Sequence, residues 1–167
     1  MSGVQFTFCL IATVVTDLDR STRFYCDGLG FEQLNTTNTG GPQMRALLET
    51  SDDPAITARY LRKDGVTLEL VYFDKPKVTD SGGTYRSMSL AGGPSHIAIN
   101  VNDIDGALKV IRQHGGQVFE HTRASFDMGD KPPIQMILCT DPDGVRIELL
   151  SMDESLRRQL VGLPPAD

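Results

Sequence analysis

Two stretches of the chain repeat one pattern of apolar and polar positions. Residues 10–15 are mostly apolar and lead into Asp17, and residues 96–101 alternate and lead into Asp103. Each Asp is followed by apolar residues at helical spacing. This order predicts a β-strand that runs into an α-helix capped by the Asp side chain, and it predicts that arrangement twice.

The spacing between the two copies is constant. Asp17 and Asp103 are 86 residues apart, as are Gly30 and Gly116. Farther along the chain, residues 64–70 match residues 143–149 at an offset of 79. We therefore interpret the chain as a tandem duplication.

Each copy is predicted to contain one helix and a series of strands in the order β-α-β-β-β. In the first copy, strands are predicted at 6–15, 31–35, 44–49, 56–61 and 66–73, one more than this order contains, with a helix at 17–27 and a loop at 36–42. In the second copy, strands are predicted at 96–101, 117–122, 134–139 and 145–151, a helix at 103–114 and a loop at 124–133. The predicted fold class is α+β, with two tandem β-α-β-β-β modules forming a curved mixed sheet around a cleft.

The domain organisation follows from these elements. The first module is expected at residues 1–77 and the second at 95–152. A Gly-rich linker at 78–94 joins them, and a C-terminal helix and tail follow at 153–167.

Composition narrows the classes of function. The 167 residues are 40% hydrophobic and 23% charged, enough for a buried core, and the net charge is -6. An acidic chain lacks the basic face that a nucleic-acid partner requires. No apolar run is long enough for a membrane span. Three scattered cysteines and the lack of a signal-like N-terminus favour free thiols in the cytoplasm.

Equivalent positions on the first and last strands of the two modules could face one cleft. They are Leu10, Glu69, His96 and Glu148. An imidazole and two carboxylates are ligands for Zn, Ni, Mn, Co or Fe(II). Both Glu residues interrupt otherwise apolar strands, where a carboxylate must be hydrated, paired or bound to metal.

A plainer interpretation of the same residues stays open. Alternation places Glu69 on one face with Thr67 and Val71, so its carboxylate could simply point to solvent. A single strand histidine such as His96 is more often a structural residue than a ligand. The recurrence of Glu in both copies, together with His96, favours the functional interpretation.

The sequence resembles the vicinal oxygen chelate superfamily, which includes glyoxalase I, methylmalonyl-CoA epimerase, extradiol dioxygenases and the fosfomycin- and bleomycin-resistance proteins. The resemblance covers residues 6–152 and rests on the repeated helix starts and on the segments at 24–31, 95–98 and 141–149. It implies the paired-module fold and a homodimer. It specifies the fold more closely than the activity, because one fold hosts many chemistries.

The resemblance also implies a ligand set. His96 and Glu148 match the ligands of the second module, and Glu69 matches the last-strand ligand of the first. The fourth position falls on Leu10, where glyoxalase I has His or Gln, and leucine cannot bind a metal. This departure weighs against a direct glyoxalase assignment, and the two-His, one-Glu set of the extradiol dioxygenases is not matched either.

Three functions are consistent with these residues. In the first, a divalent ion acts as a Lewis acid for a lyase, isomerase or epimerase that forms an enolate of a small oxygen-bearing substrate, with Glu148 or Glu69 as base. In the second, no metal is bound and the cleft sequesters a small molecule, as in bleomycin-resistance proteins. In the third, the protein is a dioxygenase with a rearranged ligand set.

Other side chains are weaker candidates for the pocket. An anionic substrate could be met by a basic side chain through charge-assisted hydrogen bonds. The segment at 124–130 could be a lid with an apolar anchor, or a plain loop. The residues concerned are Leu10, Arg45, Arg59, Arg86, Arg123, Lys131 and, as the anchor, Phe126.

Overall fold

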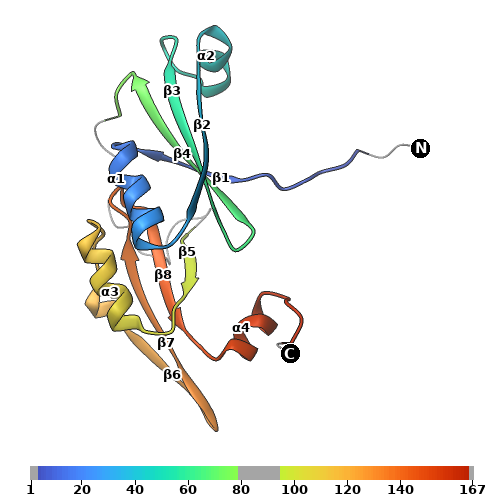
Figure 1. Ribbon diagram of the computed structural model, residues 1–167, viewed down its shortest axis with the longest axis vertical. Coiled ribbons are helices and arrows are strands. Elements are labelled where there is room, and N and C mark those ends of the chain that lie inside the picture. The colour runs from blue at the N-terminus through green and yellow to red at the C-terminus, as the bar shows by residue number, and fades with distance from the viewer. Residues whose placement is uncertain (1–3, 79–94, 166–167) are drawn as a thin grey trace. The chain divides into compact units, whose positions relative to one another are not determined.

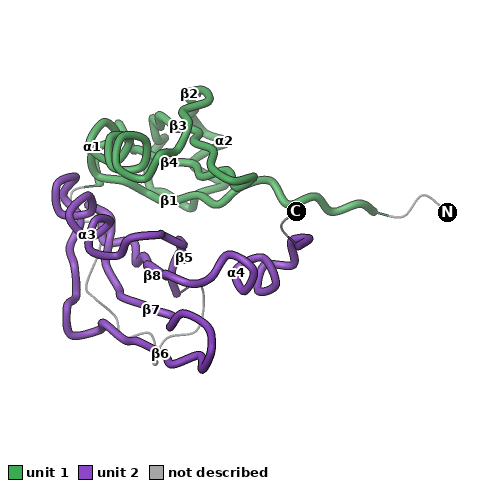
Figure 2. The backbone as a smooth tube through the Cα atoms, turned by 60° about the horizontal axis from the view of Figure 1, so that its bottom comes forward, with its two compact units in different colours: residues 1–81 green, residues 82–167 purple. Residues whose placement is uncertain are grey.

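Each copy of the repeat builds its own four-stranded mixed sheet (Figure 1). The computed structural model describes residues 4–78 and 95–165. The chain divides into two compact units, residues 1–81 (unit 1) and residues 82–167 (unit 2), coloured separately in Figure 2. The predicted α+β class and the two β-α-β-β-β modules are confirmed. Except for Val78, the predicted linker at 78–94 lies outside the described residues.

The elements follow the chain in a regular order. Unit 1 contains β1 Ile11–Val15, α1 Leu18–Arg23, the π-helical turn η1 Phe24–Gly28, β2 Glu32–Gly40, α2 Pro42–Leu48, β3 Ala55–Lys63 and β4 Val66–Lys75. Unit 2 contains β5 Ile97–Asn100, α3 Ile104–Gln113, the 3₁₀ turn η2 Glu120–Thr122, β6 Ala124–Met128, β7 Lys131–Thr140, β8 Arg146–Ser151 and α4 Glu154–Leu160.

The two sheets have the same strand order and the same register. The order is β1-β4-β3-β2 in unit 1 and β5-β8-β7-β6 in unit 2, with the first pair of each sheet parallel and the others antiparallel. Ile11 pairs with Leu68, and Ile97 pairs with Ile147. These pairs are related by the offsets of 86 and 79 found in the sequence, so the duplication is preserved in the hydrogen-bonding register.

Both predicted helix starts are confirmed. The Asp17 side chain accepts a hydrogen bond from the Arg20 backbone N–H, and Asp103 accepts one from that of Gly106. Each cap satisfies a backbone donor that the helix leaves unpaired, a contribution of about 1 kcal/mol. After η1, Gly30 takes a φ of 73°, which favours glycine, and turns the chain into β2.

The core of each unit lies between its sheet and its main helix. In unit 1, Phe24 and Tyr25 are buried with Leu61 and Leu70. In unit 2 the buried residues of α3 and of the neighbouring strands are Ile104, Leu108, Ile111, Ile137, Ile147 and Leu149. Full burial of one such side chain contributes about 1.5–3 kcal/mol. The core therefore fixes one face of each sheet against a helix.

The chain between β2 and β3 differs from the prediction. The strand expected at 44–49 and the loop expected at 36–42 are wrong: β2 extends to Gly40, and residues Pro42–Leu48 form α2. Met44, Ala46 and Leu48 alternate as a strand would, but the segment consists of strong helix formers behind a proline at the first helical turn. Local propensity outweighs the alternating pattern here.

The middle of unit 2 also differs. The loop expected at 124–133 is a hairpin of β6 and β7, while the strand expected at 117–122 is reduced to a single bridge, Val118 to Cys139, followed by η2. Pro132 and Pro133 lie before Gln135, where the pairing of β7 with β8 begins, and next to an irregularity in the β6 pairing. Proline is tolerated in a strand at such positions.

The predicted C-terminal helix is confirmed as α4, and each unit closes its last hairpin with a tight turn. Asp64 and Gly65 both have positive φ and close the hairpin between β3 and β4. The buried Asp141 accepts hydrogen bonds from the backbone N–H groups of Asp143 and Val145, which fixes the turn before β8. Among the described residues, no helix is long and apolar enough to cross a membrane.

Candidate functional site

The two glutamates of the repeat occupy equivalent places in their sheets. Glu69 pairs with Ala12 and Tyr60, and Glu148 pairs with Ala98 and Leu138. Their neighbours along the strands, such as Leu70 and Leu149, are buried on the helix side. Successive side chains of a strand point to opposite faces, so both glutamates lie on the face turned away from the main helix, which we call the far face.

His96 and Glu148 meet on the far face of unit 2. The imidazole Nε2 lies 3.4 Å from Oε2 of Glu148, and the two side chains are 23% and 15% exposed. His96 immediately precedes β5, and the parallel pairing of β5 with β8 brings it beside the carboxylate. Two sequence-predicted residues that are 52 positions apart are therefore in contact distance.

Ser95 extends this pair on its other side. The Ser95 hydroxyl lies 2.8 Å from Nδ1 of His96. If Nδ1 carries the proton and donates a hydrogen bond to the Ser95 hydroxyl oxygen, the lone pair of Nε2 faces Glu148. Two negative ends facing each other require a cation or a proton between them. Sequence reasoning did not single out Ser95, because a serine beside a strand histidine gives no distinctive pattern.

Unit 1 supplies a carboxylate but no imidazole at the equivalent positions. Glu69 is partly buried on the far face of unit 1, and Leu10 is partly buried just before β1. Because the register is the same in both units, Leu10 occupies the place that His96 has in unit 2. The substitution noted in the sequence therefore falls on the predicted ligand position.

Two basic residues proposed for a pocket, Arg45 and Arg123, have local acidic partners. Arg45 pairs with Asp53 at 3.2 Å beside α2. Arg123 donates to Asp105 at 2.6 Å and holds the pKa of that carboxyl below its usual value. Lys131 is exposed at the start of β7, and Arg86 lies outside the described residues. Phe126 is 51% exposed on β6, as part of a hairpin.

Arg59 lies on the helix side of its sheet. It pairs in register with Leu70, while its neighbour Tyr60 pairs with Glu69. Its guanidinium donates to Asp19 at 3.0 Å and to the Thr22 hydroxyl at 2.7 Å, both on α1. Arg59 therefore ties α1 to β3 and does not share a face with Glu69.

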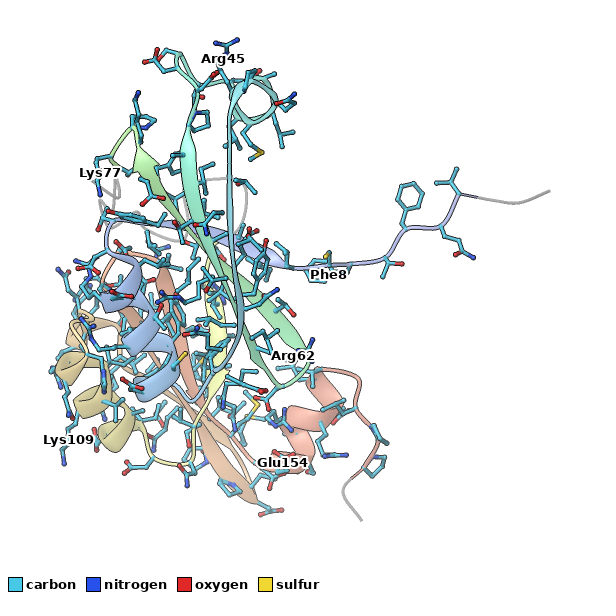
Figure 3. All side chains as sticks on the ribbon, turned by 45° about the horizontal axis from the view of Figure 1, so that its top comes forward. Phe8, Arg45, Arg62, Lys77, Lys109 and Glu154 are labelled. Atoms are coloured by element: carbon cyan, nitrogen blue, oxygen red, sulfur yellow. The ribbon has the colours of Figure 1, made fainter. Side chains whose placement is uncertain are left out.

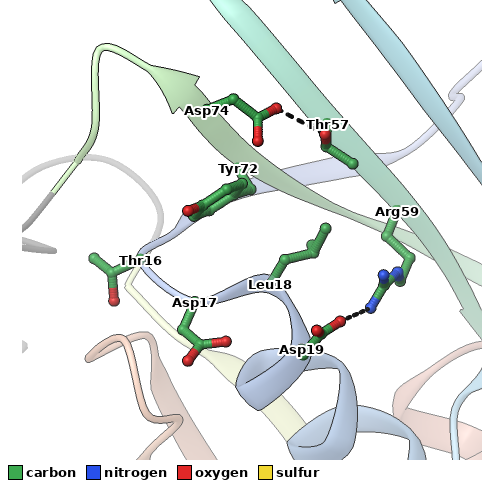
Figure 4. A pocket seen from close by; sticks show the side chains of 8 residues that line it. All are labelled: Thr16, Asp17, Leu18, Asp19, Thr57, Arg59, Tyr72 and Asp74. Carbon is green, nitrogen blue, oxygen red and sulfur yellow. Dashed lines mark hydrogen bonds and ion pairs between the residues drawn. The ribbon is translucent and has the colours of Figure 1, made fainter.

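A hollow of about 420 Å³ opens between the start of α1 and strands β3 and β4 (Figure 4). Its lining residues are Thr16, Asp17, Leu18, Asp19, Thr57, Arg59, Tyr72 and Asp74. The acidic groups have partners: Asp17 caps α1, Asp19 meets Arg59, and Asp74 accepts from Thr57 at 2.8 Å. The hollow belongs to the helix side of unit 1 and not to the far face.

Metal-binding capacity can be tested on the donors themselves. Within the described residues, no three His, Cys, Asp or Glu side chains gather at one point that could hold a metal ion. His96 and Glu148 nevertheless have a suitable separation. Two donors about 2.1 Å from a tetrahedral ion lie about 3.4 Å apart, which equals their observed distance. The pair fits two positions of a metal site, and further ligands must come from elsewhere.

The repeated register, the far-face glutamates and the His-Glu pair define a tandem β-α-β-β-β protein with metal-type donors. The model of the Glyoxalase/Bleomycin resistance protein/Dioxygenase superfamily matches residues 8–149, and the chain belongs to this family. The resemblance seen in the sequence is thereby confirmed.

Two relatives with assigned names support the assignment of the chain to this family. A probable lactoylglutathione lyase of Synechocystis sp. is 31% identical over 142 residues, which cover 81% of this chain and 88% of the relative. The lactoylglutathione lyase of Salmonella typhimurium is 29% identical over 143 residues, covering 86% of this chain and 90% of the relative. Both alignments span nearly the whole repeat.

A solved structure shows the fold independently. A glyoxalase family protein from Bacillus cereus superposes with a TM-score of 0.71 at 16% sequence identity, covering 90% of this chain and 97% of the other. At this identity the similarity establishes the fold alone. The chemistry has to be argued from the residues of this chain.

Proposed function

We propose that this protein is a metal-dependent lyase or isomerase that holds one divalent ion through His96, Glu148 and Glu69. The observation that carries the proposal is the His96–Glu148 contact at 3.4 Å on the far face of unit 2. The equivalent register of Glu69 in unit 1 supports it as the third ligand.

The chemistry follows from the donor types. When bound, the ion would supply Lewis-acid polarisation of a substrate carbonyl oxygen and so favour an enolate. His96 would bind through Nε2 while Ser95 holds the proton on Nδ1. Glu148 or Glu69, once it releases the ion, would accept the proton next to the carbonyl group, because a carboxylate within hydrogen-bond reach of a carbon acid can act as its base.

The substrate proposed is a small oxygen-bearing molecule of the thioester class. Two relatives are named for lactoylglutathione, the thioester of lactate and glutathione. Leu10 replaces one polar ligand with an apolar side chain, so we expect the preferred substrate to present an apolar group near this position. We also propose that the protein works as a homodimer in the cytoplasm.

Metal binding by matched variants tests the proposal. Chelator-treated protein would be titrated with Zn²⁺, Ni²⁺, Mn²⁺ and Co²⁺ in a calorimeter. The variants Glu148→Gln and Glu69→Gln should each weaken binding by about 100-fold, because a charged ligand becomes a neutral one. Glu32→Gln, an exposed glutamate of β2, should bind as the wild type does. If Glu69→Gln binds the ions as tightly as the wild type does, Glu69 is not a ligand.

Leu10 at the fourth ligand position also favours a second function, the binding of a small molecule without metal. If wild-type protein binds none of these ions and still binds lactoylglutathione or a related thioester, the cleft is a metal-free binding site. The His96–Glu148 pair would then be a structural ion pair, and Leu10 would line an apolar pocket. Calorimetry with the thioester in the presence and absence of metal separates the two functions.

A further inference from the structure

The segment before β1 carries large apolar side chains in water. Residues 4–10 run as an extended arm, and Figure 3 shows Phe8 on it, away from the sheet of unit 1. Val4, Phe6 and Phe8 are 82%, 93% and 78% exposed. The alternation of Val4, Phe6 and Phe8 is that of a strand with one apolar face. The arm therefore has the sequence of a strand.

The register of unit 1 explains why this arm continues beyond the sheet. The sequence predicts a strand over 6–15, but pairing with β4 begins at Ile11, which lies opposite Leu68. Extending the parallel register places Cys9 beside Val66, the first residue of β4. Residues before Cys9 thus extend past the end of β4, and the prediction was wrong for residues 6–10 within this sheet.

Charge and position make the arm suitable for contact with a second copy of the chain. Residues 4–16 contain no charged side chain, although the whole chain has a net charge of -6. Two copies can approach along this stretch without opposing like charges. The arm also continues β1, which lies at the edge of its sheet and has Ile11 and Val14 each 45% exposed.

The exposed area is sufficient for a specific interface. The four exposed apolar side chains of residues 4–14 that share one strand face, Val4, Phe6, Phe8 and Val14, offer on the order of 500 Å² in each copy. A symmetric pair would remove about 1,000 Å² from water, which reaches the lower limit for specific protein–protein contacts. A contact of the same segment with itself also satisfies the symmetry of a two-fold dimer.

We propose that residues 4–10 form an antiparallel strand pair with the same residues of a second copy, with Phe6 and Phe8 as the apolar anchors. Pairing of an extended segment with an exposed strand edge is a common mode of association, because main-chain hydrogen bonds supply affinity. This inference deepens the homodimer proposed above, and it does not depend on the metal site.

The test is the oligomeric state of anchor variants of the full chain. Sedimentation equilibrium should give twice the chain mass for the wild type. The double variant Phe6→Asp/Phe8→Asp should raise the dimer dissociation constant by at least about 100-fold, because charges replace two aromatic anchors. Phe6→Leu/Phe8→Leu should remain dimeric. The control Leu47→Asp/Leu160→Asp alters two leucines that are 73% and 68% exposed elsewhere, and it should also remain dimeric.

Several results would overturn the proposal. A wild type that is monomeric at every concentration removes both the dimer and the arm contact. If the dimer survives the Phe→Asp changes, or is lost equally in the control, the arm contact is excluded while the dimer itself is not.

Amide hydrogen exchange checks the native chain directly: the arm should be protected in the dimer and lose protection on dilution. Fast exchange in the dimer, or protection in a monomer, contradicts the proposal. Metal titration of the same variants should remain unchanged, which separates this failure from that of the proposed function.

Discussion

In unit 1 the residue before the first strand is Leu10, and in unit 2 the residue at the same place is His96. The first strand of each unit pairs with the last strand in the same register. The last strand of each unit carries a glutamate at the same position. The backbone plan was therefore retained in both units while the donor set was not. The two units teach that pairing register constrains a duplicated sheet more tightly than side-chain chemistry on its far face does.

The units also differ in how their last hairpin is closed. Both turns contain a glycine with positive φ, Gly65 in unit 1 and Gly144 in unit 2, and in unit 1 Asp64 has positive φ as well. Unit 2 adds a side chain: the carboxylate of Asp141, which is 1% exposed, accepts from the backbone of Asp143 and Val145 at 2.9 and 2.8 Å. The turn of unit 2 therefore combines the glycine conformation with buried hydrogen bonds.

The largest effect is expected from breaking the turn of unit 2. Asp141→Ala leaves two backbone donors without their acceptor and should lower the free energy of unfolding by about 3 kcal/mol. Asp64→Ala, the matched change in unit 1, should cost about 1 kcal/mol, because alanine must take a positive φ. Urea unfolding followed by circular dichroism measures both. Equal losses would mean that the two turns are held in the same way.

Making unit 2 resemble unit 1 should abolish strong metal binding. His96→Leu removes the proposed nitrogen ligand and should weaken binding of Zn²⁺ or Ni²⁺ by about 100-fold, or about 2.7 kcal/mol. His121→Leu, at an exposed histidine of η2, serves as the control. Calorimetric titration of the two variants gives the comparison, and equal affinities would show that His96 is not a ligand.

Making unit 1 resemble unit 2 should have the opposite effect. Leu10→His restores an imidazole at the fourth position and should tighten metal binding by about tenfold. Ile11→His places the same group on the next residue, whose side chain points to the other face, and should leave the affinity unchanged. A Leu10→His variant that binds metal no better would place the first strand of unit 1 away from the site.

A smaller difference lies in the cores. Cys139 pairs with Ile147 at the place where Leu61 pairs with Leu68 in unit 1. Burial raises the pKa of the Cys139 thiol from 9.0 to about 12, with a smaller contribution from Asp141. The thiol thus keeps its proton in the folded state above the pH at which the unfolded chain loses it. This contribution to stability is complete below pH 9.0 and falls as the pH rises toward about 12.

The measurable consequence is at alkaline pH. Between pH 8 and pH 10 the titration of Cys139 should cost wild-type protein about 1 kcal/mol of stability that Cys139→Ala does not lose. Urea unfolding at both pH values, with Cys9→Ala as the control at an exposed thiol, isolates this difference. A wild type and a Cys139→Ala variant with parallel pH dependence would contradict the assigned shift.

The positions of the predicted donors could be inferred from the repeat, and their contacts only partly. The offsets of 86 and 79 already aligned Glu69 with Glu148 and Leu10 with His96. They did not give the contact of His96 with Glu148, nor the side of the sheet that Arg59 occupies. Both depend on pairing between distant strands, which a local pattern does not encode.

The sequence by itself determined the duplication, the helix starts at Asp17 and Asp103, and the register positions of the glutamates. These features depend on local periodicity and on the backbone preferences of a few residues. The tertiary structure decided that residues Ala124–Met128 pair as a strand and that His96 meets Glu148. Such outcomes depend on which strands become neighbours, because short segments with mixed signals take the conformation that their partners stabilise.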